Sequence, residues 1–442
     1  MAHHSVSDLD SHRAPFGYAR ALGDYVMASP SSYHAVAAAA ELLRGAGFTE
    51  LHGSEAWSDV VGRHFTIRDG ALIAWVAPRD YRAGAGSRIL GAHTDSPGFK
   101  LKPKPTTVSN GWYQAGVEVY GGVLLNSWLD RDLRLAGRIV VRGENGELTQ
   151  HLCATEAIAR IPQLAIHLDR GANDGLKLDK QQHVQPIWGT GSAQDADVLG
   201  LLADMAEASV SPEDIVGFDI VLADTQKPEL IGQRRQLLAS GRLDNLSSVY
   251  AGLHAFVEHA EELESASQVS MLAAFDHEEV GSATRSGAAG PFLEDVLVRI
   301  SAAQGESQDD YRRSLAESVC LSADAGHLVH PNYRGHHDPV NTPEPGSGPL
   351  LKINANQRYT TDAMGAGLWA DACDRAGVSY QEFVSNNNVP CGSTIGPITA
   401  TRLGMRTLDV GVGLLSMHSA RELAHVDDLH ALSRVTGAFW RS

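Results

Sequence analysis

The sequence predicts an α/β protein in which a mixed central sheet flanked by helices is interrupted by an inserted β-rich domain. Short apolar runs such as Ser87–Ala92 and Val269–Phe275 have the length and composition of buried strands. Helical patterns such as Ser31–Arg44 and Thr360–Arg375 occur in the same parts of the chain. Between residues 99 and 234, short alternating segments are instead separated by turn sequences, which is typical of β-hairpins.

The change of pattern at residue 99 sets the expected domain boundaries. Residues 1–98 and 235–442 should form one discontinuous α/β domain, and residues 99–234 should form the insertion. The alternative is one continuous mixed sheet without a separate domain, because topology is harder to derive from a sequence than the type of each element.

Composition excludes several classes of function. The 442 residues include 36 Lys and Arg against 53 Asp and Glu, which gives a formal net charge of −17. We expect no nucleic-acid partner, because such binding depends on neutralising phosphates with basic side chains. No apolar stretch is long enough to span a bilayer, and the polar N-terminus does not resemble a secretory signal, so no membrane partner is expected. Four scattered cysteines favour a cytoplasmic protein with reduced thiols.

The motif His277-Glu278-Glu279-Val280, at the end of the apolar run Val269–Phe275, is the most informative part of the sequence. Two adjacent carboxylates at the tip of a buried strand disfavour each other's charged form. In a metal hydrolase, one carboxylate can bind the metal while its neighbour handles the proton of the attacking water. The motif is not the helical His-Glu-x-x-His zinc signature, since no second histidine follows. The alternative is a solvated acidic cluster in a turn.

Other predicted strands end in the same way, at an acidic residue or a histidine. One apolar run ends at His93, a second ends at Asp324 and a third reaches His418, while Asp244 directly precedes a helical pattern. Because functional crevices in open α/β sheets lie at the carboxyl ends of the strands, we expect these side chains to meet. Five ligands can hold two zinc ions if one carboxylate bridges them. The candidate ligands are His93, Asp244, Glu279, Asp324 and His418.

Residues beside these candidates carry further expectations. Asp95 lies two residues after His93 and could orient its imidazole, although an Asp before Ser96-Pro97 could also simply form a turn. Ser419 and Glu422 have the spacing of a capping box, which predicts a helix directly after His418. Since no thiolate is among the candidate ligands, Mn²⁺ or Co²⁺ could replace zinc.

Six strings in the sequence resemble the aspartyl aminopeptidase family, a group of dinuclear zinc exopeptidases that includes vacuolar aminopeptidase I-like enzymes. They occur in the same order from about residue 15 to the end, and together they are far more specific than any single motif. The resemblance implies a zinc exopeptidase-like fold with an inserted dimerisation domain, and two Zn²⁺ ions per subunit. The strings are GAHTDSPGFKLKP, GRLDNLSS, DHEEVGS, LSADAGHLVHPNY, NQRYTTDA and SMHSARE.

The resemblance also implies a role for each residue of the site. Glu278 would be the catalytic residue, which takes a proton from the attacking water and returns it to the leaving amine. Asp244 would bridge the two ions, and its peptide bond to Asn245 is expected to be cis. The other ligands would be His93 and Asp324 on one ion, and Glu279 and His418 on the other.

Substrate recognition is expected to involve two residues outside the ligand set. Lys352 follows an apolar run, and the resemblance places it in the pocket for an acidic substrate side chain, where it would oppose the negative field of the chain. A surface lysine is the alternative. Tyr359 resembles the residue that hydrogen-bonds the oxyanion of the tetrahedral intermediate, and a core tyrosine at a helix start is the alternative.

The resemblance further implies an assembly. The inserted domain would dimerise, and His167 would reach into the active site of a neighbour. Family members form tetrahedral dodecamers built from dimers, which would restrict the substrates to peptides. Gln163 and Asp169 differ from the residues often found beside this histidine, which leaves its hydrogen bonds undetermined.

The leading hypothesis is therefore an aminopeptidase that removes N-terminal Asp or Glu from peptides. The alternatives are the same chemistry with a preference for neutral residues such as Leu, a deacylase or carboxypeptidase on the same scaffold, and an inactive assembly or cargo protein. One histidine cluster receives no ligand role, because the five-ligand set is already complete. Its members are His327, His330, His336 and His337.

Overall fold

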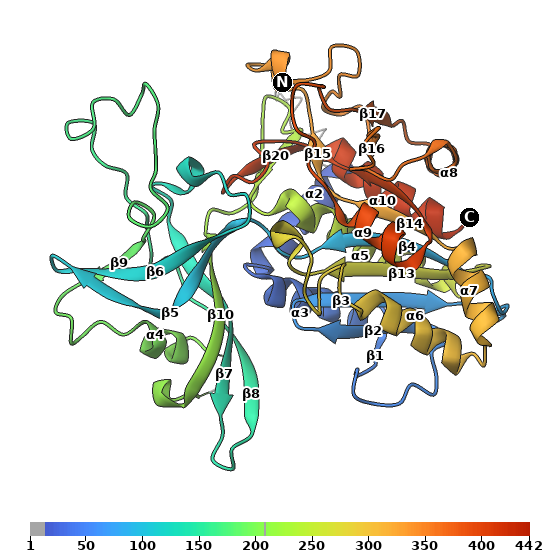
Figure 1. Cartoon of the computed structure of the whole chain (residues 1–442), viewed down its shortest axis with the longest axis horizontal. Helices are drawn as coiled ribbons and strands as arrows, with labels where there is room; N and C mark the ends of the chain where they lie inside the picture. Colours follow the sequence, from blue (N-terminus) through green and yellow to red (C-terminus); the bar gives the residue numbers. More distant parts are fainter. Residues whose placement is uncertain (1–13, 207–208) are drawn as a thin grey trace, which may run out of the picture.

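The computed structural model describes residues 14–206 and 209–442 (Figure 1). Its centre is a nine-stranded sheet with the order β1-β2-β3-β13-β4-β14-β18-β16-β17. Strands β13, β4, β14 and β18 run parallel to one another, while β3 and β16 are antiparallel to their neighbours β13 and β18, so the predicted mixed sheet is confirmed. The strands are β1 (Thr49–Glu50), β2 (Gly62–Arg68), β3 (Ala71–Ala77), β4 (Ser87–His93), β13 (Val269–Phe275), β14 (Val319–Ala323), β16 (Leu350–Lys352), β17 (Gln381–Phe383) and β18 (Arg406–Gly411).

Helices cover both faces of this sheet, as the continuous apolar strands require. Along β3, Leu72 and Ala74 belong to one buried cluster, whereas Ile73 and Trp75 belong to the cluster on the opposite face. The first face is covered by α2 (Ala14–Ala28), α3 (Ser32–Gly45), α5 (Leu243–Leu263), α8 (Ala363–Ala376) and α10 (Val426–Trp440). The second is covered by α6 (Phe292–Ala303), α7 (Gln308–Glu317) and α9 (Ile395–Leu403).

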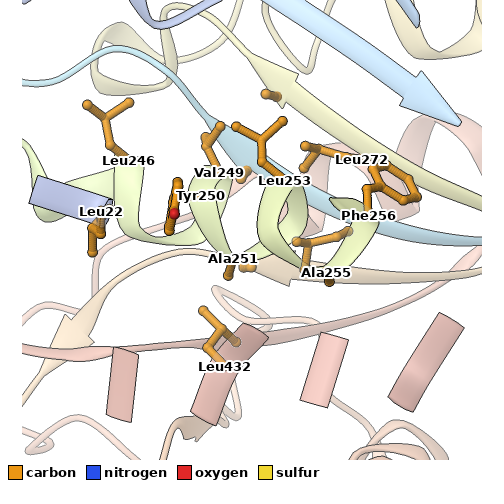
Figure 2. Close-up of a cluster of buried hydrophobic side chains, with 14 of the residues drawn as sticks. Leu22, Leu246, Val249, Tyr250, Ala251, Leu253, Ala255, Phe256, Leu272 and Leu432 are labelled. Carbon is orange, nitrogen blue, oxygen red and sulfur yellow. The ribbon is translucent and has the colours of Figure 1, made fainter. Parts of the chain in front are cut away.

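Helix α5 lies at the centre of the first layer and positions part of the site. Its apolar side chains face the sheet and the neighbouring helices, as Figure 2 shows for Leu253 and Phe256. The ring of Phe256 also stacks on Trp440 of α10, with the ring centroids 4.1 Å apart. At its start, Arg242 has a left-handed backbone and Asp244 a non-helical one. The packed body of the helix therefore holds a kinked first turn in a fixed place.

The insertion forms a separate antiparallel sheet with the order β8-β7-β10-β5-β6-β9, seen on the left in Figure 1. It has its own buried cluster, which includes Phe99, Trp128 and Leu222. All its strands lie between Gly98 and Asp224, which supports the division that we propose at residues 99–234. Its elements are β5 (Gly98–Ser109), β6 (Trp112–Tyr120), η1 (Leu125–Trp128), β7 (Leu133–Arg142), β8 (Leu148–Ala154), β9 (Ile187–Thr190), α4 (Val198–Asp204), η2 (Pro212–Asp214) and β10 (Ile215–Asp224).

A third sheet, with the order β11-β12-β20-β19-β15, contains the first two strands that follow the insertion, β11 and β12. The helix expected directly after His418 is wrong: Glu422 begins strand β20, and helix α10 starts only at Val426. Among the described residues, no helix combines the length and apolar character needed to cross a membrane. The remaining elements are β11 (Glu229–Ile231), β12 (Leu237–Ser240), η3 (Glu278–Val280), β15 (Gly326–His327), η4 (Arg334–His336), β19 (Gly413–Leu415) and β20 (Glu422–His425).

Candidate metal centre

Three neighbouring parallel strands bring candidate ligands to one edge of the central sheet. His93 is the last residue of β4 and pairs in register with Phe275, the last residue of β13. Glu279 lies in η3, which follows β13, and Asp324 directly follows β14 on the other side of β4. The carboxyl ends of these strands therefore place an imidazole between two acidic groups, as the sequence predicts.

Asp244 completes the constellation from the kinked start of α5. Its Oδ1 lies 3.4 Å from Nε2 of His93, and its Oδ2 lies 3.3 Å from Nε2 of His418. Nε2 of His93 is 3.5 Å from Asp324, and Nε2 of His418 is 3.5 Å from Glu279. Asp244 is thus common to two ligand groups, one with His93 and Asp324 and one with Glu279 and His418.

The geometry of Asp244 suits cation binding. Its carboxylate is buried, and its Oδ1 has no hydrogen-bond partner among the residues that the structure describes. A buried, unpaired carboxylate oxygen is costly unless a cation satisfies it. The separations of 3.3–3.5 Å also exceed the roughly 2.7–3.2 Å of an ordinary N–H···O hydrogen bond. The nitrogen and oxygen donors are those that zinc prefers.

The pKa values reflect how many acidic groups share this small volume. Burial opposes ionisation of Asp244, but the facing imidazoles of His418 and His93 hold its pKa well below the ordinary range. Burial, and then the charge of Asp244, raise the pKa of Glu279 far above its usual value. Burial likewise raises the pKa of Glu278 to about 7. The centre is therefore a concentration of negative charge that positive ions would neutralise.

Asp95 supports the centre mainly through the turn of the two glutamates, whereas we expected its carboxylate to orient the imidazole of His93. Nδ1 of His93 lies 3.0 Å from the backbone oxygen of Asp95, and 3.4 Å from its carboxylate. The carboxylate itself accepts hydrogen bonds from the backbone N–H of Glu278 at 3.0 Å and of Glu279 at 3.1 Å. Its main contacts therefore hold the turn that carries the two glutamates, while the backbone carbonyl orients the imidazole.

Two residues that support the centre have no role in it in the prediction from the sequence. Glu422 is buried on β20, and its carboxylate accepts hydrogen bonds from the backbone N–H of Asp244 at 3.0 Å and of His418 at 2.9 Å. Burial raises the pKa of Glu422 to about 8. Tyr120, at the end of β6 in the insertion, donates a hydrogen bond to Asp95 at 2.7 Å. The sequence offered only the Ser-x-x-Glu spacing for Glu422, which we assigned to a helix cap, and no signal for Tyr120.

Lys352 is buried rather than exposed, so the surface interpretation of this lysine is wrong. Its side chain is 1% exposed, and Nζ donates to the backbone oxygen of Ala325 at 2.7 Å. Nζ also lies 3.5 Å from Asp324, one of the candidate ligands. Tyr359 is buried next to it, with the ring centroid 5.3 Å from Nζ. A cation is therefore held beside the centre, in a wall that also contains Phe383.

The other predicted residues lie elsewhere. His167 is exposed in the insertion, in the chain between β8 and β9, and is not part of any ligand group found in residues 14–206 and 209–442. His330 and His337 bond within their own loop, where the backbone N–H of His330 donates to His337 at 3.0 Å. The histidine cluster forms no metal-binding group within the described chain. The peptide bond between Asp244 and Asn245 is cis, as expected.

Comparison with known proteins places this site in a family. Residues 25–440 match the family model described as aminopeptidase I zinc metalloprotease (M18). A probable M18 family aminopeptidase 2 of Streptomyces avermitilis is 48% identical over 425 residues, covering 96% of this chain and 97% of the relative. A protein of the same description from Mycobacterium tuberculosis is 43% identical, covering 95% of this chain and 97% of the relative.

Solved structures agree with this assignment. A chain in the cryo-EM structure of the Ape4 and Nbr1 complex has a TM-score of 0.93 at 35% identity, covering all of this chain and 87% of that one. The S. cerevisiae mApe1 dodecamer gives a TM-score of 0.84 at 29% identity, with 96% and 97% covered. Both structural matches cover at least 96% of this chain. The chain belongs to the M18 family, the aminopeptidase I zinc metalloproteases, and is a zinc metalloaminopeptidase.

Proposed function

We propose that this aminopeptidase removes N-terminal Asp or Glu from peptides and does so at a centre of two Zn²⁺ ions. The observation that carries the acidic preference is the buried ammonium group of Lys352, 3.5 Å from Asp324. The observation that supports two ions is the position of Asp244 in both ligand groups. A cytoplasmic location, in which the four free cysteines would stay reduced, is part of the same proposal.

We assign the ligands by their proximity. Asp244 would bridge the ions, because its two oxygens face different histidines. The ligands of one ion would be His93 and Asp324, and those of the other Glu279 and His418. When bound, zinc acidifies a coordinated water and polarises a carbonyl group. With no thiolate among the donors, Mn²⁺ or Co²⁺ would fit the same residues.

Glu278 is our candidate for the catalytic residue. It is within 4.8 Å of His93 and Glu279 through its carboxylate, but it is not a member of either group that contains Asp244. The hydrogen bond from its backbone N–H to Asp95 fixes the start of the turn. Its pKa of about 7, raised by burial, suits a group that accepts a proton from water and later gives it to the leaving amine.

Lys352 would bind the acidic side chain of the substrate. A buried ammonium group needs anionic or carbonyl partners, and Nζ has one firm bond, to Ala325, with donor capacity left for a further acceptor. In a protein with net charge −17, such a fixed local cation is what an acidic residue requires. The aromatic rings of Tyr359 and Phe383 pack in a T-shaped arrangement beside it and shape the same wall.

Tyr359 would donate its hydroxyl hydrogen to the oxyanion formed during hydrolysis. Burial, together with the neighbouring Cys391 and the charge of Asp324, raises the pKa of Tyr359 above its ordinary value. The hydroxyl thus stays protonated and able to donate. The alternative, a core tyrosine, predicts that Tyr359→Phe lowers the melting temperature without lowering kcat. Our proposal predicts a lower kcat, with KM nearly unchanged.

We further propose a homo-oligomer, specifically a tetrahedral dodecamer built from dimers. The support is an exposed apolar segment around His167, in which Leu164, Ile166 and Leu168 are 57%, 46% and 75% exposed. Apolar side chains exposed in a row are typical of a protein interface. The related mApe1 of S. cerevisiae is itself a dodecamer. His167 would then reach the active site of a neighbouring subunit.

A panel of aminoacyl chromogenic substrates tests the proposed specificity. We expect kcat/KM for Asp and Glu substrates to exceed that for Leu by at least about tenfold, the equivalent of about 1.4 kcal/mol. A clear preference for Leu would favour the second candidate, the same chemistry on neutral residues. Membership in an aminopeptidase family argues against the deacylase and carboxypeptidase alternatives. The convergence of all the candidate ligands argues against an inactive protein.

A further inference from the structure

The inserted domain contacts the candidate metal centre through a short segment, Tyr120–Leu124, at the end of β6. This segment hydrogen-bonds the carboxylate of Asp95 and the imidazole of His418, and at Gly121 it runs so close to Glu279 that an added Cβ would meet the backbone oxygen of Glu279. The insertion itself contains none of the five candidate ligands. Its contacts act on Asp95, which holds the turn of the two glutamates, and on Glu279 and His418, which are candidate ligands themselves.

Tyr120 acts on Asp95. Its hydroxyl donates to Oδ2 of Asp95 at 2.7 Å, and the same Oδ2 accepts the backbone N–H of Glu279 at 3.1 Å. Oδ1 of Asp95 accepts the backbone N–H of Glu278 at 3.0 Å. The carboxylate is 5% exposed, so water contributes little to fixing its orientation. The tyrosine hydroxyl therefore fixes the plane of the carboxylate that holds the two glutamates.

Gly121 and Gly122 act on the second pair of ligands. Gly121 has a positive φ of 69°, and a Cβ placed there would lie 3.0 Å from the backbone oxygen and 3.1 Å from Cβ of Glu279. The backbone oxygen of Gly122 lies 3.1 Å from Nδ1 of His418 and accepts a hydrogen bond from it, which leaves Nε2 facing Asp244 and Glu279. The insertion thus sets both the position of one ligand and the tautomer of the other.

A second backbone contact strengthens this junction. The N–H of Leu124 donates to the backbone oxygen of His418 at 3.0 Å, and Ser127 accepts the N–H of Ala420 at 2.9 Å. His418 has a left-handed backbone with φ of 65°, a conformation that non-glycine residues rarely adopt without support. The segment after β6 thus hydrogen-bonds both the side chain and the backbone of His418.

We propose that Tyr120–Leu124 is a positioning segment through which the inserted domain sets the metal affinity of the centre. Tyr120 is a positioning residue that acts through Asp95, and Gly121 and Gly122 act through Glu279 and His418. This inference rests on the proposed ligand set. It assigns the insertion a role within each subunit, separate from any role in assembly.

The test compares two tyrosines of the same strand. Tyr120→Phe removes only the hydroxyl that Asp95 accepts, whereas Tyr113→Phe removes a hydroxyl from a residue that packs on Trp188 inside the insertion. Zinc is titrated from each purified variant with a competing chelator, and kcat and KM are measured with saturating zinc. We expect Tyr120→Phe to weaken zinc retention by about 10- to 100-fold and to leave KM unchanged. Tyr113→Phe should retain zinc as the unchanged protein does.

Two glycines of the insertion give an independent second test. Gly121→Ala and Gly111→Ala both place alanine at a positive φ, 69° and 79°, so both carry similar backbone strain. Only the alanine at 121 meets Glu279, since no atom lies within 4 Å of a Cβ at 111. We expect Gly121→Ala to lose zinc more readily than Gly111→Ala, while the metal-free forms melt at similar temperatures.

Equal zinc retention in Tyr120→Phe and Tyr113→Phe, or in Gly121→Ala and Gly111→Ala, would overturn the inference. If one variant of a pair does not fold, the other pair decides. A different failure would expose the proposed function instead: if the unchanged protein retains no zinc against the chelator, the ligand set itself is wrong. Zinc loss that appears only in the Tyr120 and Gly121 variants supports the positioning role.

Discussion

The central sheet and the inserted sheet contribute to the site in opposite ways. In the central sheet, β13, β4 and β14 end side by side, and each strand delivers a side chain directly to the centre. In the insertion, β6 and the residues directly after it supply a hydroxyl and a backbone carbonyl that support other residues, and we propose that His167 acts outside its own subunit. The positions of the ligands at the strand ends are fixed by local chain geometry. The supporting contacts from the insertion depend instead on how the two domains pack against each other.

The largest effect should come from the residue shared by both ligand groups. Asp244→Asn replaces the carboxylate that we propose as the bridge by an amide, so we expect the loss of both proposed ions and a fall in kcat of at least about 10³-fold, because bound metals supply several kcal/mol of transition-state stabilisation. Metal analysis after gel filtration measures the ions. Normal metal content in this variant would move the bridging role to another residue. Asp174→Asn, in an exposed loop of the insertion, is the matched control.

Glu278→Gln should separate proton transfer from metal binding. The amide keeps the shape of the side chain but accepts no proton, so kcat should fall by about 10²- to 10⁴-fold while the zinc content stays normal. Steady-state kinetics and metal analysis on the same preparation measure the two effects. Substantial turnover would show that another group carries the proton. The exposed Glu261→Gln should behave as the unchanged enzyme.

Lys352→Met should change specificity rather than chemistry. Methionine fills nearly the same buried volume, which alanine would not, and it removes the charge that we assign to acidic substrates. We expect KM for Asp and Glu substrates to rise by about 10- to 100-fold, as a charge-assisted hydrogen bond of about 1.5–3 kcal/mol predicts. Leu substrates should be affected much less. An unchanged ratio of acidic to neutral activity would remove Lys352 from this role, and thermal unfolding checks that the variant is folded.

The smallest effect concerns the insertion. His167→Ala should lower kcat by about tenfold, the value of roughly one hydrogen bond, and only in the assembled enzyme. Leu168→Asp, which places a charge in the exposed apolar segment, should shift gel filtration towards smaller species and lower activity to a similar extent. His52→Ala, an exposed histidine of the central domain, serves as control. Full activity in a monomeric form would separate the insertion from catalysis between subunits.

The site residues that could be predicted from the sequence are those at the ends of strands. The residues that were missed depend on how the two domains pack against each other. His93 and Asp324 could be placed because apolar runs mark buried parallel strands, whose carboxyl ends share one edge. Glu422 was misassigned because the Ser-x-x-Glu spacing here leads into strand β20, and the Glu422 carboxylate accepts the backbone N–H of His418 instead of capping a helix. Tyr120 has no local signature, since its partner lies 25 residues away in the other domain. The burial of Lys352 was undetermined because a lysine after two leucines fits both a core strand and an edge.

The dinuclear centre is tested most directly by a crystal of the zinc-loaded enzyme measured at the zinc absorption edge. We predict two anomalous peaks per chain, about 3.5–4 Å apart, on either side of the Asp244 carboxylate. One should lie against His93 and Asp324, and the other against Glu279 and His418. A single peak, or peaks that do not touch Asp244, would contradict the dinuclear centre.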